Sequence, residues 1–365
     1  MSTPLQLHDQ ETRFARAFAV IREAIAHRAF PGAALAVTHR GNLIASRSFG
    51  HFIYDPTSPA IQADTIFDLA SVTKVVATTT MAMLLYERGL LDVDAPVAEM
   101  LPEFVGNLTS DQNRTRRTVT VRTLLAHSSG LPAYLKLFET TRTRTQLLRA
   151  ACSTPLVAQP GANAEYSDIG FILLGEILER VARKLLESFF YREIAEPLDL
   201  QQTLFTPPLN LAIGIPPSED DRSFRLRIIQ GEVNDENASV MGGVAGHAGL
   251  FAAATDVARF AECMLRGGPP ILKPETVALF TLRETSPAGT SRALGWDTPS
   301  PPSSSGSYFS PRSFGHLGYT GTSLWIDPER ELSVTLLTNR TWPDRGSQAI
   351  RQIRPLVHNA VVEAL

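Results

Sequence analysis

Apolar side chains near the N-terminus follow first a helical and then an extended pattern. Residues 11–29 carry apolar side chains at spacings of four, three and four, which predicts an amphipathic helix that ends before Pro31-Gly32. These side chains are Phe14, Phe18, Ile21 and Ile25. Two β-rich runs follow, Ala33–Thr38 and Leu43–Phe49, and the turn Arg40-Gly41-Asn42 between them favours a hairpin.

The C-terminal part of the chain repeats this pattern in reverse order. Thr322–Ile326 and Leu332–Thr338 are expected to be strands, and residues 347–365 place apolar side chains on one helical face. A helix and a hairpin therefore open the chain, and a hairpin and a helix close it. One antiparallel sheet built from both ends, with the two terminal helices on one face, accounts for this order.

The central part has a different, mostly helical pattern. Because 365 residues exceed what one hydrophobic core usually spans, two lobes are expected. The fold class is α+β: the sequence predicts a sheet lobe from residues 1–65 and 285–365, a mostly helical lobe from residues 66–284, and an active site between them. Helical periodicity within the second lobe is found in residues 72–88, 118–127, 167–188 and 254–266.

Composition limits the classes of partner and the location. The formal net charge of −3 does not favour nucleic acid or an anionic membrane surface, and no stretch approaches the roughly 18 apolar residues of a membrane span. Residues Met1–Gln10 lack the pattern of a secretory signal, so the protein is expected in the cytoplasm, or in the periplasm if a leader has been removed. Cys152 and Cys263 fit buried thiols better than a zinc site, although one disulfide stays open, and no metal or cofactor is predicted.

The strongest local signal for chemistry is Ser71-Val72-Thr73-Lys74, at the start of a predicted helix. Residues three apart share a helix face, so the Lys74 amine can reach the Ser71 hydroxyl. A serine needs an adjacent base to become a nucleophile, and a lysine removed from water can serve as that base. Chance alone also produces this spacing in many chains, so the motif needs support from elsewhere in the sequence.

Two further segments could supply the rest of an active site. Tyr166, in Glu165-Tyr166-Ser167-Asp168 at the start of a predicted helix, could pass protons to a leaving group, or could be an ordinary half-buried tyrosine. His316-Leu317-Gly318-Tyr319-Thr320-Gly321 leads into a strand, and its glycines would let the backbone approach a ligand and offer an N–H group to an oxyanion. The alternative for this segment is a glycine-rich strand entry with a surface histidine.

All three elements, in this order and with wide spacings, resemble the serine β-lactamase and penicillin-binding-protein superfamily. The pattern is most similar to class C β-lactamases and the related esterases and D-peptidases, and Ser-x-x-Lys is a signature of such enzymes. The resemblance covers nearly the whole chain. Further segments that resemble the family are Phe30–Ala34, Thr123–Pro132, Gly242–Phe251 and Leu337–Arg340.

The resemblance implies a role for each matching residue. Ser71 would be the acylated nucleophile, Lys74 its activating partner, and Tyr166 a base or proton shuttle. The backbone N–H groups of Ser71 and Tyr319 would form the oxyanion hole. The residues implied to contact a substrate are Tyr134, Asp168, His316, Gly318 and Asn339.

Departures from the family pattern concern the substrate. Asp168 stands where class C enzymes have an asparagine, so it can accept but not donate a hydrogen bond, and it could hold Lys74 as a cation. His316 stands in place of a lysine and Leu317 in place of a hydroxyl residue, which weakens the expected grip on a substrate carboxylate. These changes favour esters or neutral amides over penicillins.

Several functional hypotheses therefore stay open. The first is a carboxylesterase or amidase that forms an acyl-enzyme on a small ester, amide or β-lactam substrate. The others are a β-lactamase or D-alanyl-D-alanine-type peptidase, and a protein that binds β-lactams or cell-wall peptides without turnover. A Ser-His-Asp triad through His127 or His247 is a weaker alternative, because Ser71 already has a lysine partner. The acidic segment 234–237 is expected to be a solvated loop or a helix cap rather than a cation site.

Overall fold

The structure, a computed structural model, describes residues 7–106 and 111–365. Its largest sheet has five antiparallel strands in the order β2-β1-β10-β9-β8. The strands of this sheet are β1 (Gly32–His39), β2 (Asn42–Gly50), β8 (Phe314–Leu317), β9 (Ser323–Asp327) and β10 (Leu332–Thr338). The predicted α+β fold with a sheet built from both chain ends is confirmed, and β1 from the N-terminal hairpin pairs directly with β10.

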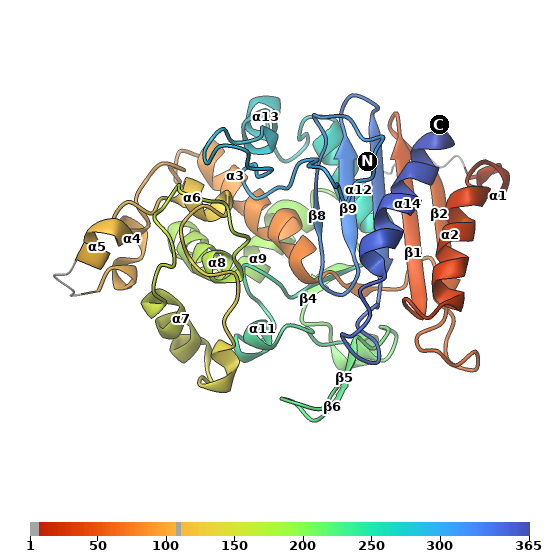
Figure 1. Cartoon of the computed structure of the whole chain (residues 1–365), viewed down its shortest axis with the longest axis horizontal. Helices are drawn as coiled ribbons and strands as arrows, with labels where there is room; N and C mark the ends of the chain where they lie inside the picture. The colour runs from red at the N-terminus through yellow and green to blue at the C-terminus, as the bar shows by residue number, and fades with distance from the viewer. Residues whose placement is uncertain (1–6, 107–110) are drawn as a thin grey trace.

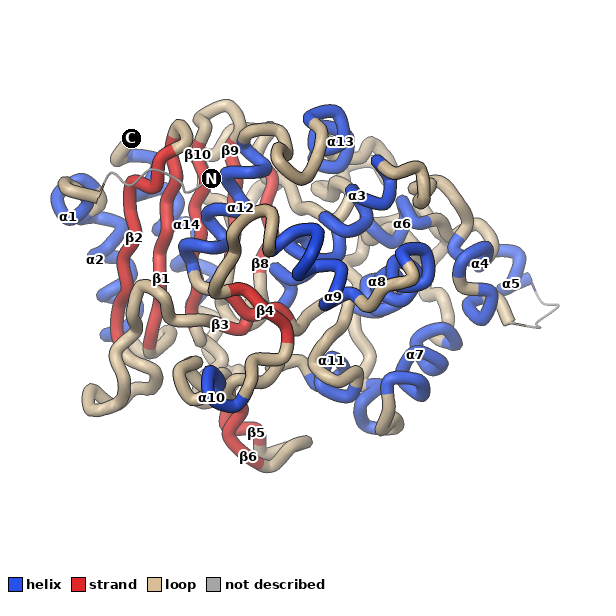
Figure 2. The backbone as a smooth tube through the Cα atoms, turned by 180° about the vertical axis from the view of Figure 1, so that it is seen from behind, coloured by secondary structure: helices blue, strands red, loops and turns tan. Residues whose placement is uncertain are grey.

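Helices cover both faces of this sheet (Figures 1 and 2). The terminal helices α2 (Ala15–Ala26) and α14 (Ile350–Glu363) pack against each other on one face, and α1 (Gln10–Arg13) precedes α2. On the other face lies α12 (Ala254–Leu265), which contacts β10, β1 and β9. Residues 254–265 were assigned to the helical lobe, yet α12 packs on the sheet. The boundaries of the two lobes therefore stay a prediction.

The alternation of side chains along β1 explains why both faces must be covered. Ala33, Leu35 and Val37 join the core under the terminal helices, whereas Ala34 and Ala36 join the larger core that extends through the helical lobe. A strand buried on both faces reads as a nearly continuous apolar run, which is what the sequence shows. Both cysteines are buried free thiols, as expected.

The remaining elements form the mostly helical lobe beside the sheet (Figure 1). No helix within the described ranges is long and apolar enough to cross a membrane. The sequence prediction for the leader rests partly on residues 1–6, which lie outside the described part. The helices of this lobe are α3 (Thr80–Glu87), α4 (Val97–Met100), α5 (Asp111–Arg116), α6 (Val121–Leu125), α7 (Arg144–Ser153), α8 (Asp168–Ala182), α9 (Leu186–Phe190), α10 (Leu209–Ala212), α11 (Glu236–Val240) and α13 (Pro274–Thr281). Its short strands are β3 (Phe67–Asp68), β4 (Thr203–Phe205), β5 (Glu219–Asp221), β6 (Arg227–Ile229) and β7 (Leu250–Ala252).

The helix predicted for residues 72–88 is not a single α-helix. It begins as a 3₁₀ turn over Ala70–Val72, continues as a π-helical stretch over Lys74–Thr79, and becomes α3 only at Thr80. The Thr80 hydroxyl donates to the Val75 carbonyl at 2.8 Å, five residues back, which suits the wider π turn. Irregular helical turns of this kind are common at functional sites.

Candidate active site

Ser71 lies on a tight turn that a buried carboxylate holds in place. The turn follows β3, and Ala70 has the left-handed φ of +46° that a residue with a Cβ adopts only at a cost. The Asp68 carboxylate accepts hydrogen bonds from the N–H groups of Ala70 at 2.8 Å and of Asn234 at 2.6 Å. Burial raises the pKa of Asp68 to about 6. One side chain therefore fixes both the turn before Ser71 and the loop at residue 234.

The Lys74 amine is fully buried and all three of its N–H donors have partners. It donates to the Ser71 hydroxyl at 2.9 Å, to the Asp168 carboxylate at 2.6 Å and to the His247 carbonyl at 3.0 Å. Burial lowers the pKa of Lys74, and the Asp168 carboxylate opposes that shift. The predicted contact between Ser71 and Lys74 is present, and so is the ion pair that the sequence suggested for Asp168.

Tyr166 lies over this pair at the N-terminal end of α8. Ser167 caps the helix by accepting the Gly170 N–H at 3.0 Å, which directs the preceding tyrosine toward the site. The Lys74 nitrogen lies 4.8 Å from the centre of the Tyr166 ring. Burial raises the pKa of Tyr166 well above 10, and the Asp168 charge adds to this effect, so the phenol is neutral at physiological pH.

The connection between β8 and β9 is tied to the nucleophile turn. The Thr320 and Thr322 hydroxyls donate to the carbonyls of Asp68 and Leu69 at 2.7 and 2.8 Å. A Cβ at Gly318 would collide with the Leu69 carbonyl and the Thr322 hydroxyl, so only glycine fits there. The backbone of Tyr319 is thereby brought beside Ser71, and within the described chain neither residue's N–H donates a hydrogen bond to another protein group.

His316, on β8, faces Tyr166, and their ring centres lie 5.8 Å apart. Burial lowers the pKa of His316 well below 6.5, so the ring is neutral. It therefore donates from Nδ1 to the Leu317 carbonyl at 2.8 Å. The histidine offers no fixed charge to a ligand, which is what the replacement of the family's lysine by His316 predicted.

A cavity of about 750 Å³ is lined by Ser71, Tyr166 and His316. Tyr134 stands at its edge, half-exposed, with its hydroxyl 3.5 Å from a Glu236 carboxylate oxygen. The residues predicted from the sequence that line the cavity are Ser71, Tyr134, Tyr166, Asp168, His316, Gly318 and Tyr319.

Asn339 is the predicted site residue that the structure places elsewhere. Its amide nitrogen donates to the carbonyls of Phe52 and Pro217 at 2.8 and 3.0 Å, and its amide oxygen accepts the Gly32 N–H at 3.3 Å. The side chain is buried and its hydrogen bonds join three chain segments, so this position does not support the predicted contact with a substrate carboxylate.

The two histidines considered for a triad have structural partners. His127 accepts the Ser167 N–H on Nδ1 at 3.0 Å. The His247 Nε2 lies 2.8 Å from the Asp235 carboxylate, which also caps α11 by accepting the Ala238 N–H at 2.8 Å. The acidic segment is therefore a helix cap at the cavity wall.

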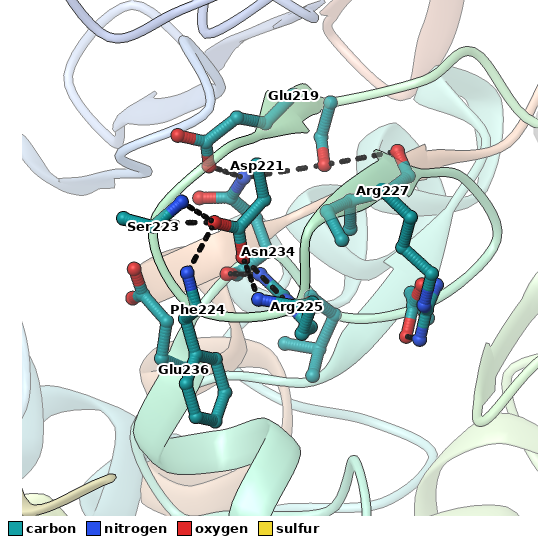
Figure 3. A network of polar contacts seen from close by, with 12 residues as sticks. Glu219, Asp221, Ser223, Phe224, Arg225, Arg227, Asn234 and Glu236 are labelled. Atoms are coloured by element: carbon teal, nitrogen blue, oxygen red, sulfur yellow. Dashed lines mark hydrogen bonds and ion pairs between the residues drawn. The ribbon is translucent and has the colours of Figure 1, made fainter. Parts of the chain in front are cut away.

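A hairpin supports this wall from outside (Figure 3). Within the turn between β5 and β6, the Asp221 carboxylate accepts three backbone N–H groups and the Nε of Arg225, all between 2.9 and 3.0 Å. Arg225 in turn donates to the carbonyls of Val233 and Asn234 at 2.7 Å each. The segment that carries Asp235 and Glu236 is thus held between the hairpin and Asp68.

Comparison with known proteins establishes the family of this chain. The sequence model described as Beta-lactamase matches residues 17–357, nearly the whole chain. This chain belongs to the beta-lactamase family. It is a serine hydrolase of that family, whose members act through an acyl-enzyme.

Curated members of the beta-lactamase family include similar proteins with amidase and peptidase names. The N-acetylmuramyl-L-alanine amidase of Bacillus subtilis (strain 168) is 34% identical over 352 residues, covering 85% of this chain and 77% of the amidase. A putative D-alanyl-D-alanine carboxypeptidase of Salmonella typhimurium is 33% identical over 306 residues, covering 76% of this chain and 70% of the carboxypeptidase.

Solved structures support the beta-lactamase fold. EstCE1, a hydrolase with promiscuous acyltransferase activity, is similar with a TM-score of 0.77 at 23% identity over 95% of this chain and 99% of EstCE1. A class C beta-lactamase from Rhodobacter sphaeroides gives a TM-score of 0.73 at 21% identity over 95% of this chain and 98% of the enzyme. At this identity the likeness establishes the fold alone.

Sequence reasoning missed a group of arginines on one wall of this beta-lactamase-family cavity. Arg340, Arg351 and Arg354 line it, and within the described chain none of the three forms an ion pair with a carboxylate. By contrast, the nearby Arg345 pairs with Glu219 at 2.6 Å and Glu236 at 2.8 Å. One signal could have found two of them, because Arg351 and Arg354 are three residues apart on the predicted C-terminal helix and therefore share a face.

Proposed function

We propose that this protein is an amide hydrolase that forms its acyl-enzyme on Ser71 and selects substrates that carry an acidic group. The observation that carries this proposal is the wall of arginines beside Tyr319. Guanidinium groups without carboxylate partners, in a cavity partly removed from water, favour an anionic ligand. The two curated relatives carry the names of an amidase and a carboxypeptidase, which is in line with cleavage of an amide bond.

Neutral ligands were predicted from Asp168, His316 and Leu317. His316 and Leu317 do offer a carboxylate little from β8. The positive charge instead comes from Arg340, after β10, and from Arg351 and Arg354 on α14. The sequence pattern did not predict that these arginines line one cavity.

The roles we assign follow from the contacts. The Lys74 amine, once neutral, accepts the Ser71 proton, and the Ser71 oxygen attacks the substrate carbonyl. The N–H groups of Ser71 and Tyr319 receive the developing oxyanion. Tyr166, neutral at rest, passes its proton to the leaving amine and recovers it from Lys74. Water then attacks the acyl-enzyme and releases the product.

Carboxylester hydrolysis is the second candidate, and the ion pair between Lys74 and Asp168 favours it. The Asp168 carboxylate stabilises the charged form of Lys74, so less of the amine is neutral and available as a base at a given pH. An alkoxide leaves from the tetrahedral intermediate more readily than an amine does, so esters need less assistance. The same cavity would then turn over activated esters faster than amides.

A matched pair of substrates tests the proposal. Two peptide amides with the same scissile bond, one with a free terminal carboxylate and the other with that group as a carboxamide, should differ at least about tenfold in kcat/KM in favour of the acid, since a charge-assisted contact contributes about 1.5–3 kcal/mol. Added salt should reduce the difference, because exposed charges are screened. A chromogenic ester and a chromogenic cephalosporin complete the panel.

The control separates the arginine wall from general charge effects. Arg351→Gln should shrink the preference for the acid, whereas Arg222→Gln, an exposed arginine paired with Asp220 outside the cavity, should keep it. Equal rates for the two amides, or turnover of the ester alone, would contradict the proposal. A persistent mass adduct without turnover would indicate a binding protein.

Asp168→Asn should move the acid limb of the pH profile for acylation to lower pH. The carboxylate raises the pKa of Lys74, so its removal lowers that pKa, and the neutral amine then forms at lower pH. The same carboxylate also raises the pKa of Tyr166, so both proton carriers shift in one direction. A shift of about 1–2 pH units is expected from one adjacent charge.

The measurement is the rate of the acyl-enzyme burst between pH 5 and pH 10. Asp297→Asn is the matched control, because Asp297 lines the same cavity without contacting Lys74. An unchanged limb, or one moved to higher pH, would mean that Asp168 does not set the charge of the proton carriers.

A further inference from the structure

Arg354, on the inner face of α14, is almost completely buried, with 5% of its surface exposed. One terminal nitrogen of its guanidinium donates to two carbonyls, those of Gly318 and Thr322, at 2.8 Å each. These carbonyls lie at the two ends of the tight connection that carries Tyr319. Arg354 therefore closes this connection from behind, on the side away from β3.

This guanidinium is a buried cation with little compensation. Within the described chain it has no carboxylate partner, and its Nε makes no hydrogen bond. Burial, together with the charges of Arg340 and Arg351, lowers the pKa of Arg354 to about 9, so the group remains charged at neutral pH. Burying an unpaired charge costs folding free energy, and the Gly318 and Thr322 carbonyls recover only part of it.

We propose that Arg354 is a positioning residue that strengthens the Tyr319 N–H as an oxyanion donor, acting through the peptide group that joins Gly318 to Tyr319. This inference rests on the oxyanion role proposed above. The carbonyl that accepts from Arg354 and the Tyr319 N–H proposed as an oxyanion donor belong to the same peptide group. A cation on the oxygen of an amide draws electron density toward that oxygen and makes the N–H a stronger donor, because hydrogen bonds in a chain polarise one another.

The effect should appear in the transition state rather than in substrate binding. The substrate carbonyl carries little charge before attack, whereas the tetrahedral oxygen carries a full negative charge. The nearby Arg340 does not duplicate the effect, because its Nε donates to the Tyr319 carbonyl at 2.7 Å and so polarises the next peptide group.

Arg354 also lines the cavity, so direct contact with an acidic substrate group is the competing explanation. The two explanations differ in the substrate that reveals them. Direct contact affects only substrates that carry the acid, and mainly their KM. Polarisation of the oxyanion donor affects neutral and acidic substrates alike, and mainly the acylation rate.

The experiment compares Arg354→Met and Arg354→Lys with the unchanged protein. It uses a neutral chromogenic ester, the peptide amide with a free carboxylate, and a boronic acid that forms a tetrahedral adduct on serine. Arg354→Met should lower the acylation rate with the neutral ester by about 10- to 100-fold, somewhat less than the loss of a whole oxyanion donor. KM corrected for acylation should stay within about threefold, and the affinity for the boronic acid should fall in parallel with kcat/KM. Arg354→Lys keeps the charge, so its acylation rate should lie between those of Arg354→Met and the unchanged protein.

Arg312→Met provides the matched control, because Arg312 is exposed on the segment before β8 and does not line the cavity. It should leave the neutral-ester rate unchanged. If Arg354→Met does not fold, Arg354→Lys carries the test, since it retains a buried cation with a donor.

Three results would overturn the inference: unchanged acylation of the neutral ester in the Arg354 variants, a loss confined to the acidic substrate, or boronic acid affinity that does not follow kcat/KM. Failure of the acyl-enzyme mechanism, on which the proposed oxyanion role rests, looks different. In that case the unchanged protein itself forms no adduct on Ser71 with either the ester or the boronic acid.

Discussion

Ser71→Ala is expected to lower acylation by at least about 10⁴-fold, because no other group takes over the attack when a catalytic serine is lost. Intact-protein mass spectrometry after treatment with a serine-directed reagent should show the adduct in the unchanged protein and none in the variant. The fold should remain, because among residues 7–106 and 111–365 the Ser71 hydroxyl forms one hydrogen bond, with Lys74, worth about 1 kcal/mol.

The control for this experiment is Ser188→Ala, which removes an exposed hydroxyl from α9 and should label normally. A labelled Ser71→Ala protein, with the adduct mapped to another residue, would remove the mechanism proposed for this cavity.

Lys74→Met should have the second largest effect, a fall of at least about 10³-fold in acylation, because the Ser71 hydroxyl loses its base. It should also destabilise the protein by about 3 kcal/mol, since the Asp168 carboxylate loses the cation that compensates its burial. Urea denaturation measures the second effect and burst kinetics the first.

A double variant separates these two consequences. Adding Asp168→Asn to Lys74→Met removes the unpaired charge, so the free energy of unfolding should recover while acylation should not. Recovery of acylation would show that Lys74 acts only by neutralising Asp168. Loss of stability without loss of acylation in Lys74→Met would exclude it as the base.

The sequence predicted those parts of the fold and site that depend on local spacing. The β-rich runs at both ends of the chain predicted the sheet, because such runs and the turns between them are visible in consecutive positions. The Ser71 and Lys74 contact follows in the same way from residues three apart. The Asp168 partner of Lys74 lies 94 residues away, and it was found only because a carboxylate stood where the family has an amide.

The parts that the sequence did not predict depend on contacts between distant segments. An asparagine side chain can bind a substrate or hold the fold together, and the sequence does not distinguish the two roles. Only the fold shows that the Asn339 amide is hydrogen-bonded to the backbone of Gly32, Phe52 and Pro217. The arginine wall joins the end of β10 to α14, so no single pattern along the chain displays it. The edge strand β8 is short and contains a glycine, which weakens its strand signal.

The three acceptors around the Lys74 amine also bear on what happens after acylation. Two of them, the Asp168 carboxylate and the His247 carbonyl, remain in place when Ser71 becomes an ester. The Lys74 amine, neutral once Tyr166 has recovered its proton, keeps both of its N–H groups on these acceptors and has none left to donate to an incoming nucleophile. The lifetime of the ester is then governed by the phenol and by whatever molecule enters the remaining space. Water, an alcohol or an amine that enters there would compete for the ester, and the products would depend on the composition of the medium.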